Sequence, residues 1–588
     1  MKEAVVKVSV RKNESLLGAV SELTHFPEFV QSLLLSRGIY RELDLDIRLK
    51  SLSNPFLMKG MSEAVDRLML ALKNKQRILI VGDFDADGAT STALLIKGLS
   101  LLGFHTLSYF LPDRFKFGYG LSPAIVKEIQ NHHVIPDVLV TVDNGISSVE
   151  GIAMANALGI DVIVTDHHLP GDVLPEAFAI VNPNQNDCNF EYKNLAGVGV
   201  AFHVLMALRQ GCRRDGQFEK EEGQEPNLAA LLDLVAIGTV ADVVHLDAYN
   251  RILVEQGLAR MRAGIVSEGI KALLVIAQKP IGQLTSQDIA FAIAPRINAA
   301  GRLDDMSLGV ELLLATQPEA AMQMAQSLDD LNKDRKLIQK QMQLEAEVIV
   351  SQLSEQFDSI PRIICVYHEQ WHQGVVGLIA SQLKERFHRP VFAFAPVFND
   401  EGGIIELKGS GRSIEGVHLR DLLDLVAKQN EGCLNKFGGH AMAAGLSLQV
   451  EQYDVFVRQA QKVVLASPDT IFEQQIWVDG VLDEASIHLD KALLLERLVP
   501  WGQGLPEPKF QGEFLLVSMR VLAEHHVKSV LKLSVSGESI EAICFNAHIE
   551  SWHAVQNSAS KLVRAVYSLS VNRFRGQEGV QLLIDFIE

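Results

Sequence analysis

Side chains that bind divalent metal ions recur where short apolar runs of this sequence end. These residues are Asp85, Asp87, Asp143, His167 and His168. In an extended segment Asp85 and Asp87 point the same way, because side chains alternate along a strand. Two carboxylates on one face repel each other unless a cation lies between them, and carboxylates combined with imidazoles suit Mn²⁺ or Mg²⁺. Two such ions about 3.5–4 Å apart activate a water and stabilise the leaving oxygen of a displacement at phosphorus. The pattern therefore indicates a dimetal phosphoesterase.

The elements that must position these side chains follow one repeating theme. Five short runs rich in β-branched residues alternate with segments that carry apolar residues at helical spacing, which predicts an α/β domain with a doubly wound parallel sheet. The predicted strands span residues 77–83, 105–113, 137–145, 161–168 and 177–183. Ligands of such sheets lie at the carboxyl ends of the strands, where the acidic and histidine residues fall. Each motif taken alone is ordinary, since Asp85–Asp87 also fits a helix cap and His167–His168 a surface pair. Their joint occurrence at successive strand ends favours a metal site.

The rest of the chain divides by composition. Residues 192–310 are mostly helical, with a polar turn predicted at 294–305. Residues 317–357 contain no glycine and predict one long helix, about 60 Å in length, that connects two lobes. A second, smaller α/β unit follows at 361–450, and five short strand-like runs after about residue 470 suggest a small barrel.

These patterns predict five segments. They are an N-terminal arm at 1–60, the metal-binding domain at 61–315, the connecting helix at 316–357, the smaller α/β domain at 358–465 and the barrel at 466–588.

The composition restricts the compartment and the partners. The five cysteines lie far apart with no CxxC pair, which argues against a zinc knuckle or a disulfide scaffold and fits a reducing cytoplasm. No apolar stretch is long enough to span a membrane, and the N-terminus lacks the apolar core of a signal peptide. The formal charge of −18 by itself favours an acidic cytosolic enzyme with a small substrate, although phosphate binding depends on local basic surface and not on the sum.

At these motifs the sequence resembles the DHH phosphoesterase superfamily, which is named for the triplet found here at Asp166, His167 and His168. Within it, the chain is most similar to the RecJ family of single-strand-specific exonucleases. The similarity covers about residues 40–588. The motif-bearing stretches are VGDFDADGATST (81–92), PDRFKFGYGLS (112–122), VTVDNGIS (140–147), VTDHHLPG (164–171), GTVADVVHL (238–246), APRINAAGRLDD (294–305), KGSGRSIEGVHL (408–419), FGGHAMAAGLS (437–447), VPWGQGLPEPKF (499–510) and VNRFRGQEGVQLLI (571–584).

The resemblance implies a site with defined roles. Two Mn²⁺ or Mg²⁺ ions would be held by Asp85, Asp87, Asp143, His167, His168 and Asp242. Asp83 and Asp166 would orient these ligands, as imidazole ligands usually require. The stretches around the smaller domain and barrel imply a DHH-associated domain and an oligonucleotide-binding (OB) fold. One position departs from the superfamily pattern, because many members have a histidine where this chain has Val81, which puts one metal ligand in doubt.

Basic and polar residues in the other motifs are predicted to bind substrate. They are Arg114, Arg296, Arg302, Ser410, Arg412 and His440, followed in the barrel by Arg573, Phe574 and Arg575. The guanidinium fork matches phosphate oxygens, and the glycines that flank Arg412 let backbone approach a phosphate. Trp552 is a second aromatic of the barrel that would either stack on a base or fill the core, with Lys528, Lys532 and Arg564 as further phosphate partners.

The function implied by the resemblance is a 5′-to-3′ exonuclease that releases mononucleotides from single-stranded DNA in recombination and repair. Single-strand-binding protein and a helicase are the expected protein partners. Two alternatives remain open from the sequence. A superfamily hydrolase for pyrophosphate or short oligonucleotides predicts a chain without the strand-rich tail. A non-catalytic replication scaffold predicts broken ligand motifs, and the ligands are present.

Overall fold

The computed structural model describes residues 6–12, 22–132, 134–220, 225–356, 359–399, 401–523, 525–574 and 576–588. They form two compact units. The first unit contains residues 10–329 and 478–588, and the second contains residues 330–477 together with the first residues of the chain.

A five-stranded parallel sheet lies in the first unit, and its strands are the five that the sequence predicts. They are β2 (Ile78–Gly82), β3 (Leu107–Phe110), β4 (Val138–Val142), β5 (Asp161–Thr165) and β6 (Ala179–Val181), in the order β3-β2-β4-β5-β6. The strands β2 and β4 are buried along their whole length, as expected for a sheet covered on both faces. The direction of strand succession reverses between β2 and β4, so the crevice at their carboxyl ends is the topological switch point.

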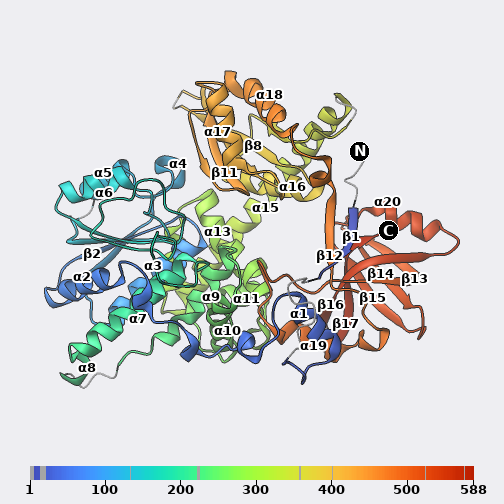
Figure 1. Cartoon of the computed structure of the whole chain (residues 1–588), viewed down its shortest axis with the longest axis horizontal. Coiled ribbons are helices and arrows are strands. Elements are labelled where there is room, and N and C mark those ends of the chain that lie inside the picture. The colour runs from blue at the N-terminus through green and yellow to red at the C-terminus, as the bar shows by residue number, and fades with distance from the viewer. Residues whose placement is uncertain are drawn as a thin grey trace. The chain divides into compact units, whose positions relative to one another are not determined.

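Helices cover both faces of this sheet (Figure 1). On one face α5 (Pro123–His132) and α6 (Val149–Ala157) pack over a cluster that includes Leu79, Val81 and Leu139. The alternate residues, such as Ile78 and Ile80, face the other side because side chains alternate along a strand. That side is covered by α2 (Met61–Lys73), α3 (Ala86–Leu101) and α7 (Gly197–Arg214).

The helical half of the first unit follows α7. It contains α9 (Leu232–Ala241), α10 (Ala248–Arg262), α11 (Glu268–Ile276), α13 (Ala294–Leu303) and α14 (Ser307–Leu314). The polar turn predicted at 294–305 was wrong, because a π-helical turn, η7 (Ile289–Ile293), leads directly into α13. Pro295 lies in the first turn of α13, where a proline removes no needed hydrogen bond, and the alanines that follow favour helix.

The long helix predicted after this half is confirmed. It is α15 (Pro318–Gln356), with 39 residues. Its residues up to Asp329 belong to the first unit, and those from Asp330 belong to the second.

The second unit contains a mixed sheet with the strand order β10-β11-β9-β8-β7. The strands are β7 (Ile364–Tyr367), β8 (Val391–Phe398), β9 (Ile404–Arg412), β10 (Lys436–Gly439) and β11 (Ala443–Leu448). Besides the part of α15 from Asp330, this unit contains the helices α16 (Val376–Phe387), α17 (Leu419–Gln429) and α18 (Tyr453–Val464), and Phe392, Phe394 and Phe456 lie in its core. The N-terminal strand expected from the sequence is β1 (Val6–Val10), which pairs with β12 (Gln474–Val478).

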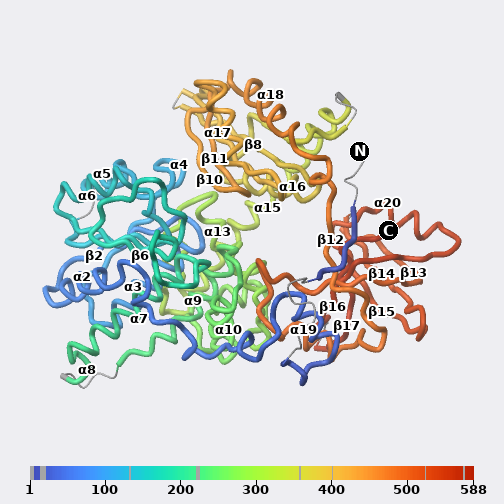
Figure 2. The backbone as a smooth tube through the Cα atoms, viewed as in Figure 1, coloured from blue at the N-terminus to red at the C-terminus, as the bar shows by residue number. Residues whose placement is uncertain are grey.

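The C-terminal strands close into the predicted barrel (Figure 2). They are β13 (Phe510–Leu522), β14 (His526–Leu533), β15 (Ser539–Cys544), β16 (Leu562–Phe574) and β17 (Gln577–Ile587), in the order β13-β14-β15-β17-β16. One helix, α20 (Ile549–Asn557), separates β15 from β16. The barrel interior is filled by side chains such as Phe514, Leu531, Tyr567 and Leu582.

Two findings concern the whole chain. Its five cysteines are free thiols. No helix in the described ranges is both long enough and apolar enough to cross a membrane.

Candidate metal centre

The turn after β2 holds the first group of carboxylates. Asp85 caps α3, and its Oδ1 accepts hydrogen bonds from the backbone N–H groups of Asp87 (2.9 Å) and Gly88 (3.0 Å). The buried carboxylate of Asp87 accepts two further bonds from the first residues of α7, at 2.6 Å from Gly197 N–H and 3.0 Å from Val198 N–H. Helix N-termini favour negative charge, so two helices hold this pair of carboxylates in place.

Asp143, the next predicted ligand, follows β4 and is 2% exposed. Its backbone is left-handed, with φ of 61°, a conformation that few residue types other than glycine, asparagine and aspartate adopt readily. The side chain fits only because residue 197 is glycine, since a Cβ there would lie 2.6 Å from the Cβ of Asp143. The N-terminus of α7 therefore positions both Asp87 and Asp143.

The DHH triplet at the end of β5 is held by the fully buried Asp166. Its carboxylate accepts the backbone N–H groups of Ile146, His167 and His168, at 2.7–3.0 Å. Oδ1 of Asp166 also lies 2.7 Å from Nδ1 of His168. These contacts agree with the predicted role of Asp166 in orienting the histidines, since its carboxylate contacts the backbone of both and the ring of His168.

The remaining predicted ligand, Asp242, caps the C-terminal end of α9. Its Oδ2 lies 3.4 Å from Nε2 of His167, and the same nitrogen lies 3.1 Å from Oδ1 of Asp143. Ligand atoms within 4.8 Å of one another form three overlapping groups: Asp143 with His167 and His168, Asp87 with His167 and Asp242, and Asp83 with Asp85 and Asp143. The structure therefore brings the six predicted ligands together, and it places Asp83, predicted to orient the ligands, in one of the same groups.

The electrostatics of this cluster favour a bound cation. Burial raises the pKa of Asp83, Asp143 and Asp242 well above the usual carboxyl value, and repulsion from neighbouring carboxylates raises it further. Burial and the charge of Asp85 raise the pKa of Asp87 to about 7. Several carboxylates at such short separations are stable in their ionised form only when cations neutralise them. The convergence of oxygen and imidazole donors therefore fits divalent metal ions of the Mn²⁺ or Mg²⁺ type.

Comparison with known proteins agrees with this geometry. Three consecutive segments match family models: the N-terminal domain of the DHH family at 77–239, the DHHA1 domain at 347–466 and the RecJ OB domain at 478–585. The chain is 48% identical to the single-stranded-DNA-specific exonuclease RecJ of Dickeya dadantii and 46% identical to that of Escherichia coli. Each alignment covers 95% of this chain and 96% of the relative. The chain belongs to the RecJ family.

A solved structure of the RecJ family matches nearly the whole length of this chain. The crystal structure of RecJ from Thermus thermophilus in complex with Mn²⁺ superposes with a TM-score of 0.78 at 28% identity, covering 99% of this chain and 79% of that one. A second crystal structure of the same protein is a complex with Mg²⁺, with a TM-score of 0.72. RecJ of Thermus thermophilus thus binds the two ions that the donor set of this chain favours.

Val81, where many superfamily members have a histidine, contributes to the hydrophobic core instead of the metal centre. It is 1% exposed and packs with Leu121 and Ile125 under the helices α5 and α6. The position therefore supplies no ligand atom in this RecJ-family chain.

Two aromatic residues near the metal centre were missed by the sequence reasoning. The guanidinium of Arg114, a predicted substrate-binding residue, lies 4.6 Å from the ring centre of Phe84, between Asp83 and Asp85 in the chain. Tyr119 Oη lies 3.1 Å from the carbonyl oxygen of Asp143 and 3.0 Å from Nδ1 of His168. Both aromatics fall inside motifs of the RecJ family, and the position of Phe84 between two aspartates was a signal that could have identified it.

Other predicted substrate-binding residues of the first unit lie in ion pairs. Arg296 binds Asp329 at 2.8 Å and the carbonyl oxygen of Ala292 at 2.6 Å. Arg573 binds Glu496 through two hydrogen bonds, of 2.7 and 2.8 Å, and Glu578 through a third. Their roles in substrate binding remain predictions, and so does that of Arg302, which lies on α13.

Of the other barrel residues considered for DNA binding, one lies in the core and two lie in ion pairs. Trp552 is 1% exposed and fills the core, so it is not a stacking platform. Lys528 pairs with Glu541, and Arg564 pairs with Glu513. The side chain of Phe574 and the whole of Arg575 lie outside the described residues.

The second unit brings two of its predicted residues together. Ser410 and Arg412 lie on β9, where Nη1 of Arg412 donates to Oγ of Ser410 at 3.1 Å. A Cβ on Gly377, in the first turn of α16, would lie 3.1 Å from that Oγ and 3.3 Å from Nη2 of Arg412. His440 follows the glycines of β10 and precedes β11. A guanidinium, a hydroxyl and a helix N-terminus therefore share one place in this unit.

Proposed function

We propose that this chain is a divalent-metal-dependent exonuclease that hydrolyses single-stranded DNA to mononucleotides from the 5′ end. The observation that carries the proposal is the convergence of six carboxylate and imidazole side chains at the switch point of the parallel sheet. The relatives of nearly equal length are named single-stranded-DNA-specific exonucleases, which supports the choice of substrate.

The ligands fall into groups that suit two ions. Asp87, Asp242 and His167 would hold one ion, and Asp83, Asp85, Asp143 and His168 would complete the surroundings of the other. When bound, the ions supply an activated water and stabilise the leaving oxygen. Asp166 keeps Nδ1 of His168 engaged, so that Nε2 is available as a ligand, and the amides of Gly197 and Val198 fix the orientation of Asp87.

Binding at the 5′ end is assigned to the cluster of Ser410 and Arg412. Burial lowers the pKa of Arg412, but guanidinium groups stay charged in proteins. This charge beside the N-terminus of α16 suits a phosphate group. Arg114, near Asp83 and Asp85, is a second phosphate partner, where the scissile phosphate would approach the ions. Selection of a terminal phosphate would give the enzyme its polarity.

The alternative functions are less well supported. A hydrolase for pyrophosphate or short oligonucleotides has no use for the closed barrel, whose family model is the OB domain of RecJ. A non-catalytic scaffold would not retain a full set of converging ligands. We also propose that the enzyme acts in the cytoplasm on DNA intermediates of recombination and repair, with single-strand-binding protein and a helicase as partners.

One assay tests the proposal. The protein is incubated with Mn²⁺ and four substrates: a 5′-labelled single strand, a 3′-labelled single strand, duplex DNA and pyrophosphate. We expect immediate release of labelled mononucleotide from the 5′-labelled single strand, late release from the 3′-labelled strand and little from the duplex. Hydrolysis confined to pyrophosphate or dinucleotides would contradict the proposal, and inactivity in both Mn²⁺ and Mg²⁺ would favour the scaffold.

A further inference from the structure

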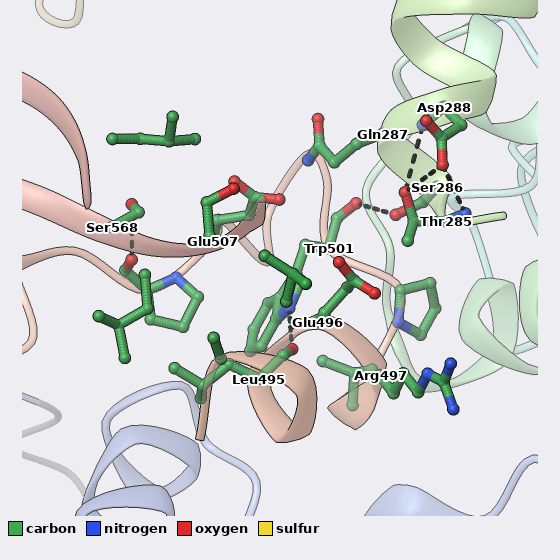
Figure 3. A pocket seen from close by; sticks show the side chains of 18 of the residues that line it. Thr285, Ser286, Gln287, Asp288, Leu495, Glu496, Arg497, Trp501, Glu507 and Ser568 are labelled. Carbon is green, nitrogen blue, oxygen red and sulfur yellow. Dashed lines mark hydrogen bonds between the residues drawn. The ribbon is translucent and has the colours of Figure 1, made fainter. Parts of the chain in front are cut away.

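A cavity of about 670 Å³ lies within the first unit, away from the metal ligands. Its walls come from the helical half, from α19 (Leu489–Leu498) with the segment after it, and from the barrel strands β16 and β17. Figure 3 shows Glu507, Trp501 and Glu496 in the middle of this pocket, between Ser568 on the barrel side and Thr285–Asp288 on the helical side. A cavity of this size accommodates a small ligand or a few peptide side chains.

Most charges around the cavity are already paired. Arg262 binds Glu255 at 2.7 Å, and Lys279 binds Asp288 at 2.7 Å. Glu496 is engaged by both terminal nitrogens of Arg573. These pairs neutralise one another, so they do not determine which charge the cavity selects.

Two charged side chains of the lining remain, Arg497, which is exposed, and Glu507. Glu507 is half-buried, and its carboxylate makes no hydrogen bond or ion pair within the described part of the chain. Burial and the charge of Asp585 raise its pKa, and Lys509, which acts in the opposite direction, is itself bound to Asp585 at 2.9 Å. A half-buried carboxylate without a partner is destabilising, and a cation from outside would remove that cost.

The surroundings of Glu507 are apolar. Trp501 is 4% exposed, with its indole N–H donated to the carbonyl oxygen of Leu495 at 2.8 Å, so its ring serves as a wall. Two other aromatic residues that line the cavity are unusually accessible: Phe291 is 76% exposed and Phe545 is 58% exposed. Phe291 lies on the π-helical turn η7, a type of distortion that occurs frequently at functional sites. Exposed aromatics around a pocket are typical of protein-binding surfaces.

We propose that this cavity binds an arginine or lysine side chain from an apolar peptide segment of a partner protein. The charged head of that side chain pairs with Glu507, and its methylene stem packs against Trp501 and the neighbouring apolar wall, an arrangement that suits the amphipathic nature of long basic side chains. A DNA phosphate is disfavoured, because Glu507 places an unpaired negative charge in the middle of the cavity.

The experiment uses the full chain and two short blocked peptides. N-acetyl-Leu-Arg-Leu-amide is titrated by calorimetry, with the same peptide carrying citrulline as a neutral probe of equal shape. Both are also titrated into Glu507→Gln, which retains the shape of the side chain, and into Glu550→Gln as a control. Glu550 is an exposed residue of α20 that does not line the cavity.

We expect the arginine peptide to bind wild type and Glu550→Gln alike. Replacement of arginine by citrulline, or of Glu507 by glutamine, should weaken binding about 10-fold, the usual effect of losing a charge-assisted hydrogen bond. Exonuclease activity of Glu507→Gln should equal that of wild type. Failure of the arginine peptide to bind at millimolar concentration, equal binding of the citrulline peptide, or displacement of the bound peptide by oligothymidylate would each overturn the proposal.

Discussion

Oδ1 of Asp166 lies 2.7 Å from Nδ1 of His168, and Asp166 is 0% exposed. The carboxylate can only accept, so this contact assigns the proton to Nδ1 and leaves Nε2 as the ligand atom. Burial alone would raise the pKa of Asp166 and lower the pKa of His168. The hydrogen bond and the opposite charges outweigh burial, so the pKa of Asp166 is lowered and the pKa of His168 is raised.

We predict that Asp166→Asn weakens metal binding, because asparagine does not stabilise the same imidazole orientation. Loss of such an orienting carboxylate typically costs 10–100-fold in metal affinity or activity. Calorimetric titration with Mn²⁺ and the Mn²⁺ dependence of the exonuclease rate would both show the shift. The control Asp172→Asn removes an exposed carboxylate from the following loop and should change neither. An unchanged Mn²⁺ affinity in Asp166→Asn would show that the contact does not position His168.

Asp143→Asn should abolish hydrolysis while the protein remains folded and bound to DNA. Asparagine is suited to this test because it tolerates the left-handed backbone at position 143, where alanine would add strain. We expect the rate to fall at least about 1,000-fold, the size of effect seen when a principal electrostatic contact to the reacting group is lost.

The same variant tests the electrostatics of the cluster by thermal denaturation. Without metal it should be at least as stable as wild type, because one of several mutually repelling carboxylates becomes neutral. With metal, wild type should gain stability, by about 2.7 kcal/mol at a concentration 100 times the dissociation constant, and the variant should gain much less. A metal-induced gain of equal size in both proteins would remove Asp143 from the ligand list.

Substitution of Gly238 tests how closely the helix α9 packs against the metal centre. A Cβ at this position in α9 would lie 2.6 Å from Oδ1 of Asp87 and 2.3 Å from Oγ1 of Thr90. Gly238→Ala should displace Asp87 and lower the exonuclease rate by about 10- to 100-fold, although alanine favours helix. Gly282→Ala is the matched control, since nothing lies within 4 Å of its Cβ. Equal rates in the two variants would mean that α9 adapts without moving Asp87.

The sequence was sufficient to predict the metal ligands that follow strands, and it was insufficient to predict the ligands and contacts that come from distant helices. Asp85, Asp143 and His168 follow strands whose alternation with helices is visible in the pattern, so the sheet edge alone predicted that they converge. Asp242 ends a helix, and only the resemblance to a family connected it with His167. The amides of Gly197 and Val198 have no side-chain signal, so their bonds to Asp87 became visible only in the fold.

The predictions that remained open or were wrong share a physical cause. Whether an arginine binds phosphate or a neighbouring carboxylate depends on tertiary contacts, as the bonds from Arg573 to Glu496 demonstrate. The prediction of a turn at α13 was wrong because its asparagine, glycine and proline are common in turns. The proline lies in the first helical turn, where it removes no helical hydrogen bond.

Arg412 provides the test of polarity. If its guanidinium and Oγ of Ser410 bind the terminal phosphate, Arg412→Gln should weaken the binding of a 5′-phosphorylated single strand about 10-fold and leave a 5′-hydroxyl strand nearly unaffected. The measurement is a comparison of the two strands by fluorescence anisotropy, with divalent ions chelated so that the strands stay intact, at one fixed salt concentration, because non-specific binding varies with salt. Arg458→Gln removes an exposed arginine of α18 in the same unit and serves as the control. If Arg412→Gln weakens both strands equally, Arg412 contacts the strand without reading its end, and the 5′ polarity must arise elsewhere.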